Sequence, residues 1–404
     1  MATRTEWEPQ AGSPERRPEL DAIRMLVVIG LIFFHSALVF ATEGDFYVTN
    51  SETTEVVTVI AGFGVVWAMP LLFLISGLGA RHSLRRRGEG RFVTERLLRL
   101  GVPLVVATVL LNPLPQWLRQ RSSDPGYDEP YLDFLPHFFD VHVEFDEFPF
   151  LVQGRYFETG HLWFVVLLLT FSLMLAPLHR WLPHAPVRRA MDRMAAAASV
   201  RRGLVLLPAL AFAALCAFAG MEEDYAGWHR WSYLLFFAAG FVLAADTRWR
   251  TAMRRDAPAA AWLGVLLFVS AAPGFTTADD PFTQTTPLAM ASRALFGAAG
   301  WCLVVAIPGL LDRPGHRLPR EPVTSPDRTP RRRAYGYLAA AVLPLYVLHQ
   351  PIVVAVAYLV AGWSAPIAVE YVVLVTVSLA LTLTAYELLV RRTRVTRFLF
   401  GMRA

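Results

Sequence analysis

Long apolar runs, separated by polar segments, fill most of the chain. A helix that spans a bilayer needs about 20 mainly apolar residues, and ten runs of the chain approach that length. The runs are residues 22–42, 56–80, 97–113, 161–178, 203–220, 231–245, 258–274, 291–311, 335–361 and 366–390. Because a helix satisfies its own backbone polar groups in lipid, the pattern predicts an all-α polytopic membrane protein with about ten transmembrane helices.

The polar segments between the runs alternate in charge. Arginine dominates residues 81–99, 179–202, 246–257 and 312–333 and the end of the chain, whereas acidic residues dominate 43–55, 114–160, 221–229 and 275–289. Cytoplasmic loops of membrane proteins carry the excess of basic residues. The alternation therefore predicts that both termini are cytoplasmic and that the acidic segments lie on the opposite side.

The same pattern divides the chain into one membrane domain, residues 21–390, and two tails. We expect residues 1–20 to be a disordered cytoplasmic tail and residues 391–404 to be a basic cytoplasmic tail. The proline-rich segment 312–333 is predicted to be a flexible cytoplasmic linker. Segment 114–160 alternates aromatic and acidic residues, which predicts a folded external loop. Its aromatic side chains either pack on the helices or bind a sugar.

Composition narrows the possible functions. Hydrophobic residues make up 55% of the chain and charged residues only 18%, which excludes a soluble or disordered protein. All 38 basic residues are arginine, and they are spread over several loops, so we expect no nucleic-acid partner. Cys216 and Cys302 lie in apolar runs without a metal-binding spacing, and we expect no bound metal.

Two ionisable residues stand on one face of the first predicted helix. Arg24 and His35 are eleven residues apart, which is three helical turns plus about 20°, and about 16 Å along the axis. Ionisable groups inside a membrane are functional candidates by default. His35 could take a proton from a hydroxyl, and Arg24 could hold an anionic group. The alternative is an arginine that extends to the interface and a histidine bonded to a carbonyl.

Further polar residues lie at the ends of other runs. Arg96 and Arg99 are spaced to clamp phosphates, or else they belong to the basic cytoplasmic loop. Ser76 can form a hydrogen bond between helices. His161 and Trp163 open the fourth run, where Trp163 is either an interfacial residue or a face for substrate.

The ninth run holds Tyr346 and His349 between two prolines, Pro344 and Pro351. Two prolines seven residues apart predict a kinked or broken helix. Such a helix can line a cavity with polar side chains. Tyr346 and His349 are therefore further candidates for contact with a substrate.

Five short motifs together resemble the acyltransferase 3 family of membrane-bound acyltransferases. They are Arg-x10-His at Arg24 and His35, Phe73-Leu74-Ile75-Ser76-Gly77, Arg-x-x-Arg at Arg96 and Arg99, His161-Leu162-Trp163-Phe164, and Tyr346-Val347-Leu348-His349. They occur in the family's order from residue 20 to about 355, and ten spans are the family's usual membrane core. The last two motifs look closest to the glucan-modifying branch.

The resemblance implies an enzyme of a bacterial cytoplasmic membrane. It would move an acyl group, acetyl or succinyl, from cytoplasmic acyl-CoA to a hydroxyl of a glycan or another cell-envelope acceptor. His35 would be the general base and Arg24 would lie near the acyl donor. Arg96 and Arg99 would bind the phosphates of CoA. Ser76, His161, Trp163, Tyr346 and His349 would contact substrate.

Other functions stay open from the sequence alone. A covalent acyl-enzyme would need a nucleophile, and neither cysteine is near the motifs in sequence. An exporter or flippase of a lipid or small molecule would be expected to show inverted repeats, and we find no convincing internal repeat. A receptor or scaffold with a buried polar network is a third possibility.

Overall fold

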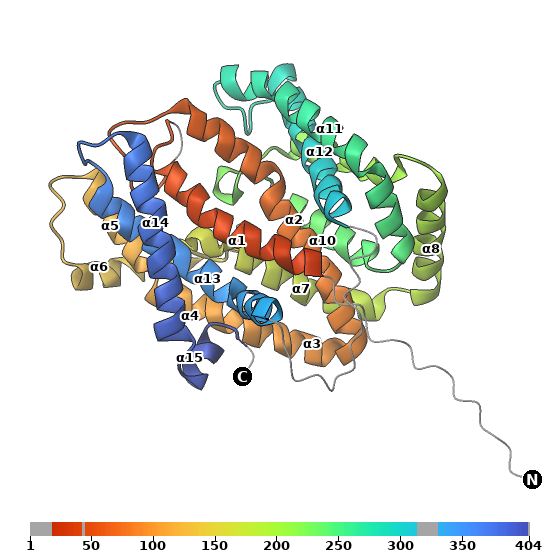
Figure 1. Ribbon diagram of the computed structural model, residues 1–404, viewed down its shortest axis with the longest axis horizontal. Coiled ribbons are helices and arrows are strands. Elements are labelled where there is room, and N and C mark those ends of the chain that lie inside the picture. The colour runs from red at the N-terminus through yellow and green to blue at the C-terminus, as the bar shows by residue number, and fades with distance from the viewer. Residues whose placement is uncertain (1–17, 43–44, 313–329, 403–404) are drawn as a thin grey trace, which may run out of the picture.

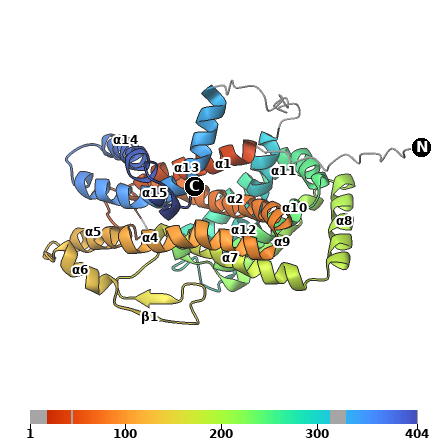
Figure 2. The same cartoon turned by 90° about the horizontal axis from the view of Figure 1, so that it is seen from below.

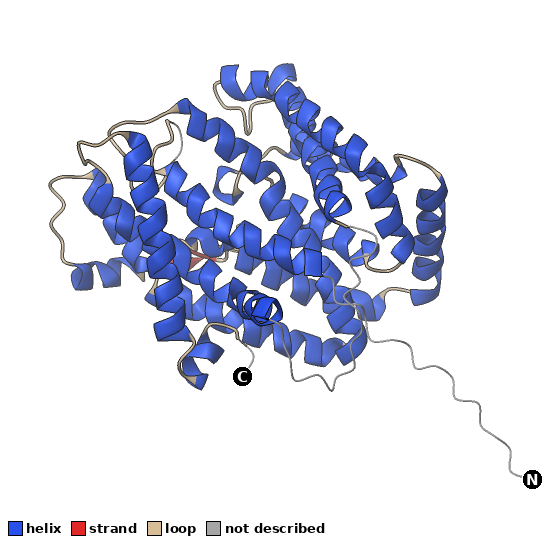
Figure 3. Ribbon diagram, viewed as in Figure 1, coloured by secondary structure: helices blue, strands red, loops and turns tan. Residues whose placement is uncertain are grey.

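The architecture is almost entirely helical, as Figure 3 shows. A computed structural model describes residues 18–42, 45–312 and 330–402. The helices are α1 (Pro18–Leu38), α2 (Glu55–Arg87), α3 (Glu89–Arg96), α4 (Val102–Leu110), α5 (Pro113–Ser123), α6 (Tyr131–Phe138), α7 (Trp163–Trp181), α8 (His184–Val200), α9 (Pro208–Ala219), α10 (Arg230–Leu243), α11 (Thr247–Thr277), α12 (Pro287–Leu311), α13 (Pro330–Val360), α14 (Ile367–Ala385) and α15 (Arg394–Leu399). Shorter helical turns cover Leu97–Gly101, Gly160–Leu162, Leu204–Leu206, Glu223–Tyr225 and Tyr386–Val390.

Within these ranges, eight helical segments are long and apolar enough to cross a membrane. They are Glu19–Leu38, Glu55–Arg87, Glu89–Ser123, Gly160–Trp181, Thr247–Thr277, Pro287–Leu311, Gly336–Val360 and Ile367–Val390. The prediction of an all-α polytopic membrane protein is thus confirmed. The side that each terminus faces stays a prediction.

The remaining two predicted spans, 203–220 and 231–245, form shorter helices. α9 has 12 residues and α10 has 14, so at about 1.5 Å per residue each covers only about 20 Å of a hydrocarbon core of about 30 Å. Gly203 and Gly220 adopt positive φ values of 77° and 82° and separate α9 from its neighbours. The helical segments Leu204–Ala219 and Arg230–Leu243 nearly fill the predicted runs, so the error lies in counting them as spans and not in their bounds.

Helix α1 runs through the middle of the molecule, against α2 and α13 (Figure 1). Helices α8, α11 and α12 lie on one side of it, and α5, α6 and α14 lie on the other. α1 therefore brings the two ends of the chain together, because α13 comes from near the C-terminus.

Helices α2 and α10 approach each other unusually closely through a pair of glycines. A Cβ atom on Gly77 would lie 1.9 Å from the carbonyl oxygen of Phe237, and one on Gly240 would lie 2.0 Å from that of Leu74. Only glycine fits at either position. The glycine that ends the Phe73–Gly77 motif is thus required by helix packing.

Segment 114–160, predicted to be a folded loop, contains α5, α6 and a hairpin of β1 (Val141–Val143) and β2 (Val152–Gly154). The strands are antiparallel and pair Val141 with Gly154. Figure 2 shows α5, α6 and β1 together at one edge of the molecule. Phe134 and Phe138 are fully buried, whereas Phe145 at the hairpin is 78% exposed. Most of the loop's core is therefore formed by its own aromatic residues.

The predicted tail 1–20 and linker 312–333 fall mainly outside the described residues, whereas most of the predicted tail 391–404 is described. Nothing is described of 1–17, 313–329 and 403–404. Helix α1 already begins at Pro18 and α13 at Pro330, so the ends of the predicted tail and linker are helical. Within the predicted basic tail, α15 forms a short helix.

Candidate functional site

The structure joins the first and fifth motifs through a contact between two histidines. Nδ1 of His35, in the last turn of α1, lies 2.9 Å from Nε2 of His349 on α13. The ring centroids are 5.0 Å apart and the rings are nearly parallel, at 23°. Residues 314 positions apart in sequence thus form one unit, which we call the histidine centre together with His161 and Tyr346.

Hydrogen-bond geometry determines which nitrogen of each ring carries a proton. Nδ1 of His349 lies 2.6 Å from the carbonyl oxygen of Tyr346. A carbonyl can only accept, so Nδ1 of His349 carries the hydrogen and, in the neutral ring, Nε2 is the acceptor. Nδ1 of His35 must then donate to it. The second nitrogen of His35, Nε2, is left with its lone pair, which is the form that a general base needs.

A proline explains how His161 reaches the same helix. Pro351 has no N–H, so it leaves the carbonyl of Val347, four residues earlier, without its helical partner. Nε2 of His161 lies 3.2 Å from that carbonyl oxygen. The hydroxyl of Tyr346 in turn donates to the carbonyl of His161. Helix α13 continues through Pro344 and Pro351 and is not broken, and the freed carbonyl serves as an attachment point.

The three histidines differ in accessibility. His349 is fully buried and His161 is 6% exposed, whereas His35 keeps partly exposed surface. The ring of Phe46 stacks on His35 with centroids 6.0 Å apart. His35 is thus the least buried of the three histidines.

Trp163 lies two residues after His161, whereas Ser76 lies at the Arg24 end of α1, directly after Ile75, whose carbonyl accepts from Arg24. Trp163 packs in an aromatic cluster with Tyr225, Tyr233 and Phe73, at centroid distances of 5.9, 5.1 and 6.4 Å. Ser76 is half-buried on α2. The prediction that either contacts substrate stays a prediction.

Arg24 is held at the opposite end of α1 from His35. Its Nη1 lies 3.3 Å from the carboxylate of Asp21, one turn earlier, and its Nη2 donates to the carbonyl of Ile75 on α2 at 3.1 Å. The side chain remains 33% exposed. Arg24 is therefore anchored between α1 and α2 with part of its guanidinium accessible.

Arg24 belongs to a group of four arginines around Arg96. The charges of Arg24, Arg87 and Arg99 all act on Arg96, as does that of Glu95. Glu95 pairs with Arg87 and lies 3.7 Å from Arg99. We call Arg24, Arg87, Arg96 and Arg99, with Glu95, the arginine cluster. It carries a clear excess of positive charge.

Arg96 is the member of this cluster whose surroundings are most informative. Its guanidinium lies over the ring of Phe92 at 5.0 Å, and its buried Nε has no hydrogen-bond partner among the described residues. The turn that follows, Leu97–Gly101, is π-helical and carries Arg99. Such turns often mark functional sites. The cluster thus offers a donor to an anionic ligand.

Sequence reasoning missed a group of polar residues beyond the end of α1. The hydroxyl of Tyr47 donates to Glu158, which also accepts from Gln116. Arg119 pairs with Asp45 and lies 3.8 Å from Glu158. Burial raises the pKa of Glu158 above its usual range, and burial together with the Glu158 charge raises that of Tyr47 well above its own. Only the acidic charge of these segments was visible in the sequence.

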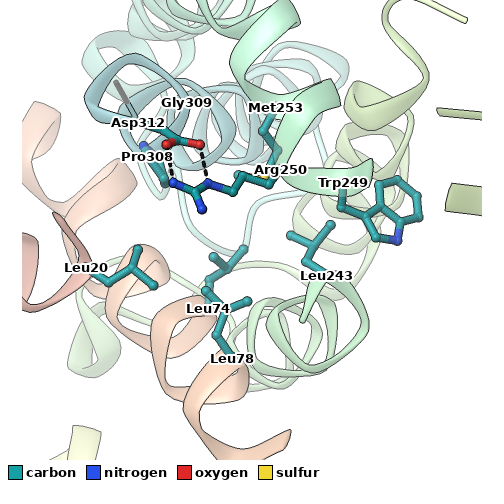
Figure 4. A pocket seen from close by; sticks show the side chains of 10 residues that line it. All are labelled: Leu20, Leu74, Leu78, Leu243, Trp249, Arg250, Met253, Pro308, Gly309 and Asp312. Carbon is teal, nitrogen blue, oxygen red and sulfur yellow. Dashed lines mark hydrogen bonds and ion pairs between the residues drawn. The ribbon is translucent and has the colours of Figure 1, made fainter. Parts of the chain in front are cut away.

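A pocket near the beginning of α1 does not touch the histidine centre. Figure 4 shows it between α1, α2, α10, α11 and α12, lined mainly by apolar side chains such as Leu20, Leu74 and Trp249. The carboxylate of Asp312 accepts from Nε and Nη2 of Arg250, both at 2.5 Å. The pocket holds about 30 Å³, which is space for about one water molecule. It is too small for a substrate.

Comparison with known proteins supports the resemblance of the motifs. The chain is 26% identical to glucans biosynthesis protein C of Salmonella gallinarum (strain 287/91 / NCTC 13346) over 198 residues. The match covers 48% of this chain and 47% of that protein, so the chain spans about half the length of the curated relative it matches. No solved structure matches the chain.

The model of the acyltransferase 3 family, described as an acyltransferase domain, matches residues 17–387. That range contains all five motifs and both the histidine centre and the arginine cluster. Because the match extends over nearly the whole chain, the protein belongs to the acyltransferase 3 family.

Proposed function

We propose that the protein is an integral-membrane O-acyltransferase. It transfers an acetyl or succinyl group from cytoplasmic acyl-CoA to a hydroxyl of a glycan or other cell-envelope acceptor, in a bacterial inner membrane. The family and the similarity to glucans biosynthesis protein C support this activity. The observation that carries the proposal is the hydrogen bond from His35 to His349, because it leaves Nε2 of His35 unprotonated.

In the proposed reaction, Nε2 of His35 takes the proton of the acceptor hydroxyl. The hydroxyl oxygen then attacks the thioester carbonyl carbon, and the carbon–sulfur bond breaks. The thiolate of CoA leaves with the electron pair and receives the proton from His35. The products are the acyl ester and CoA with a free thiol. General-base catalysis of this kind contributes about 10²–10⁴-fold in rate.

The arginine cluster is the proposed site for the phosphates of acyl-CoA. Guanidinium groups bind phosphates through paired hydrogen bonds, and Arg96 and Arg99 would provide them. Arg24 would hold the donor nearer to the reacting centre, since it lies about 16 Å along α1 from His35. An acyl-CoA bound at the cluster would extend its thioester along α1.

The other predicted site residues, apart from Ser76, would act around His35. His161, Tyr346 and His349 are buried and bonded to one another or to backbone carbonyls, which supports a role in shaping the site. Trp163 and Ser76 would line the approach of substrate from α7 and α2. Direct transfer is favoured over a covalent cysteine intermediate because Cys216 and Cys302 are fully buried.

The test uses purified protein in nanodiscs with acetyl-CoA and succinyl-CoA. Binding and slow acyl-CoA hydrolysis are compared in the wild type, His35→Ala and the double variant Arg96→Ala/Arg99→Ala. We expect the arginine variant to lose affinity, and His35→Ala to bind acyl-CoA but lose turnover. A folded wild type that binds neither donor at millimolar concentration would exclude short-chain CoA chemistry, and transport of a lipid or small molecule would be tested next.

A further inference from the structure

A second, larger pocket lies between α5 and the segment that follows β2. Its volume is about 370 Å³, and it is lined by Gln116, Arg119, Gln120, Arg155, Tyr156, Phe157 and Glu158. A volume of this size falls in the range of small-ligand sites. We call it the polar pocket, and it belongs to the segment predicted to be the external loop.

The chemistry of the lining differs from that of the arginine cluster. The amides of Gln116 and Gln120 both donate and accept hydrogen bonds, the carboxylate of Glu158 accepts, and the guanidinium of Arg155 donates. Sugar hydroxyls are both donors and acceptors, so a mixed lining can bind them. Arg155 also stacks on Tyr156, with its guanidinium 5.1 Å from the ring centroid, which gives a flat surface beside the polar groups.

Charge in the polar pocket is balanced. Arg119 pairs with Asp45 and faces Glu158, so the cations Arg119 and Arg155 are matched by two carboxylates. A pocket without excess charge suits a neutral ligand with many hydroxyls better than an anion.

Hydrogen bonds lead from the polar pocket to Gln350, on the same helix as His349 of the histidine centre. Glu158 accepts from Tyr47, and the hydroxyl of Tyr47 in turn interacts with the side chain of Gln350. Gln350 follows His349 directly in sequence. Phe46 packs edge-on against Tyr47 at 5.6 Å and stacks on His35. Two aromatic rings, those of Tyr47 and Phe46, therefore lie between Glu158 at the edge of the polar pocket and His35.

We propose that the polar pocket binds a neutral saccharide acceptor, with Arg155 and Tyr156 as its main contacts and a sugar hydroxyl presented at the Tyr47–Glu158 edge. The identification of this ligand as the acceptor rests on the proposed function. The binding site itself can be tested without it.

The experiment measures saccharide binding to the full-length protein in nanodiscs by saturation-transfer NMR and calorimetry. The probes are maltotetraose, cellotetraose and laminaritetraose, with inorganic phosphate as a charged alternative. Arg155→Ala and Tyr156→Ala are expected to weaken saccharide binding about fivefold or more each, which corresponds to about 1 kcal/mol.

Arg121→Ala is the matched control. Arg121 lies two residues after Arg119 on α5 and stacks on Trp117 at the same distance of 5.1 Å, but it does not line the polar pocket. We expect saccharide binding to be unchanged in this variant. Thermal unfolding of all variants checks that the loop remains folded.

Three results would overturn the proposal: no saccharide bound by the wild type, equal losses in Arg121→Ala and Arg155→Ala, or binding of phosphate in place of saccharide. Acyl-CoA binding is measured on the same samples. Intact acyl-CoA binding without a saccharide site would reject the polar pocket alone. Saccharide binding without acyl-CoA binding would reject the proposed function and retain the pocket.

Discussion

The two ends of α1 carry groups of side chains that differ in charge, exposure and support. At its beginning, Arg24 joins the arginine cluster, in which ion pairs to Asp21 and Glu95 hold partly exposed side chains around Arg96. At its end, His35 joins the histidine centre, in which neutral rings are oriented by backbone carbonyls. The first arrangement suits binding of a charged, mobile group. The second suits a proton transfer, which requires one fixed direction.

If this division is correct, a change in the histidine centre should alter turnover, and a change in the arginine cluster should alter affinity. The largest effect is expected from His349→Leu, which removes the acceptor for Nδ1 of His35. We expect kcat to fall about 100-fold, within the range of a general base, with acyl-CoA binding nearly unchanged. Steady-state kinetics and calorimetry on the same preparation measure both.

His349→Gln is the conservative partner of that variant. The Oε1 atom of glutamine has the same reach as Nε2 of histidine and accepts a hydrogen bond, so it can hold His35 in the same tautomer. We expect it to restore at least part of kcat. Equal loss in the leucine and glutamine variants would mean that His349 acts only through packing.

The next largest effect is expected in the arginine cluster. Arg96→Ala should weaken acyl-CoA binding about 10- to 100-fold, because a hydrogen bond to a charged group contributes about 1.5–3 kcal/mol. Saturating kcat should change little. Arg86→Ala, an exposed arginine at the end of α2, is the control and should bind normally. An equal loss in both variants would point to the general charge of this segment.

In the wild-type protein, salt should weaken ligand binding at the arginine cluster and leave turnover at the histidine centre unchanged. Partly exposed charges are screened over about 10 Å at 0.1 M ionic strength and over about 3 Å at 1 M. Raising NaCl from 0.05 to 0.5 M, about tenfold, should therefore weaken acyl-CoA binding several-fold while kcat at saturation stays constant. Saccharide binding in the balanced polar pocket should also stay constant. A kcat that falls with salt would contradict the separation.

The smallest effect is expected for Pro351→Ala. Alanine restores an N–H that can bond to the carbonyl of Val347, so it competes with His161 for that oxygen. We expect kcat to fall only about two- to threefold and the unfolding temperature to stay within a few degrees, since helix propensity rises as the His161 contact weakens. An unaffected rate would show that the His161 contact is structural.

Sequence alone predicted the helical class and eight of the spans, because these follow from local periodicity. It did not predict the partner of His35, since His349 lies 314 residues away and no local pattern encodes that pairing. The runs 203–220 and 231–245 were counted as spans because they are apolar, although the helices they form are shorter than a membrane crossing. One contact could have been predicted from the sequence. A proline frees the carbonyl four residues earlier, so Pro351 identifies the carbonyl of Val347 as a free hydrogen-bond acceptor.

The polar pocket could not be predicted from the sequence, for a different reason. Its residues come from two short stretches, 116–120 and 155–158, that have no chemical motif in sequence. Asn112 donates to the carbonyls of Glu158 and Thr159, at 3.2 and 2.9 Å, and helps to hold the segment before α7 against α5. Contacts between residues far apart in sequence, which no local pattern encodes, thus form this pocket.

The hydrogen-bond chain of the histidine centre also has a consequence for the membrane. A proton entering at Nε2 of His35 can be relayed through Nδ1 to His349, but the next group is the carbonyl of Tyr346, which has no proton to pass on. The series of hydrogen bonds therefore ends at this carbonyl and cannot conduct the proton further. An enzyme that transfers protons within a bilayer can in this way avoid conducting protons across the membrane and dissipating the ion gradient.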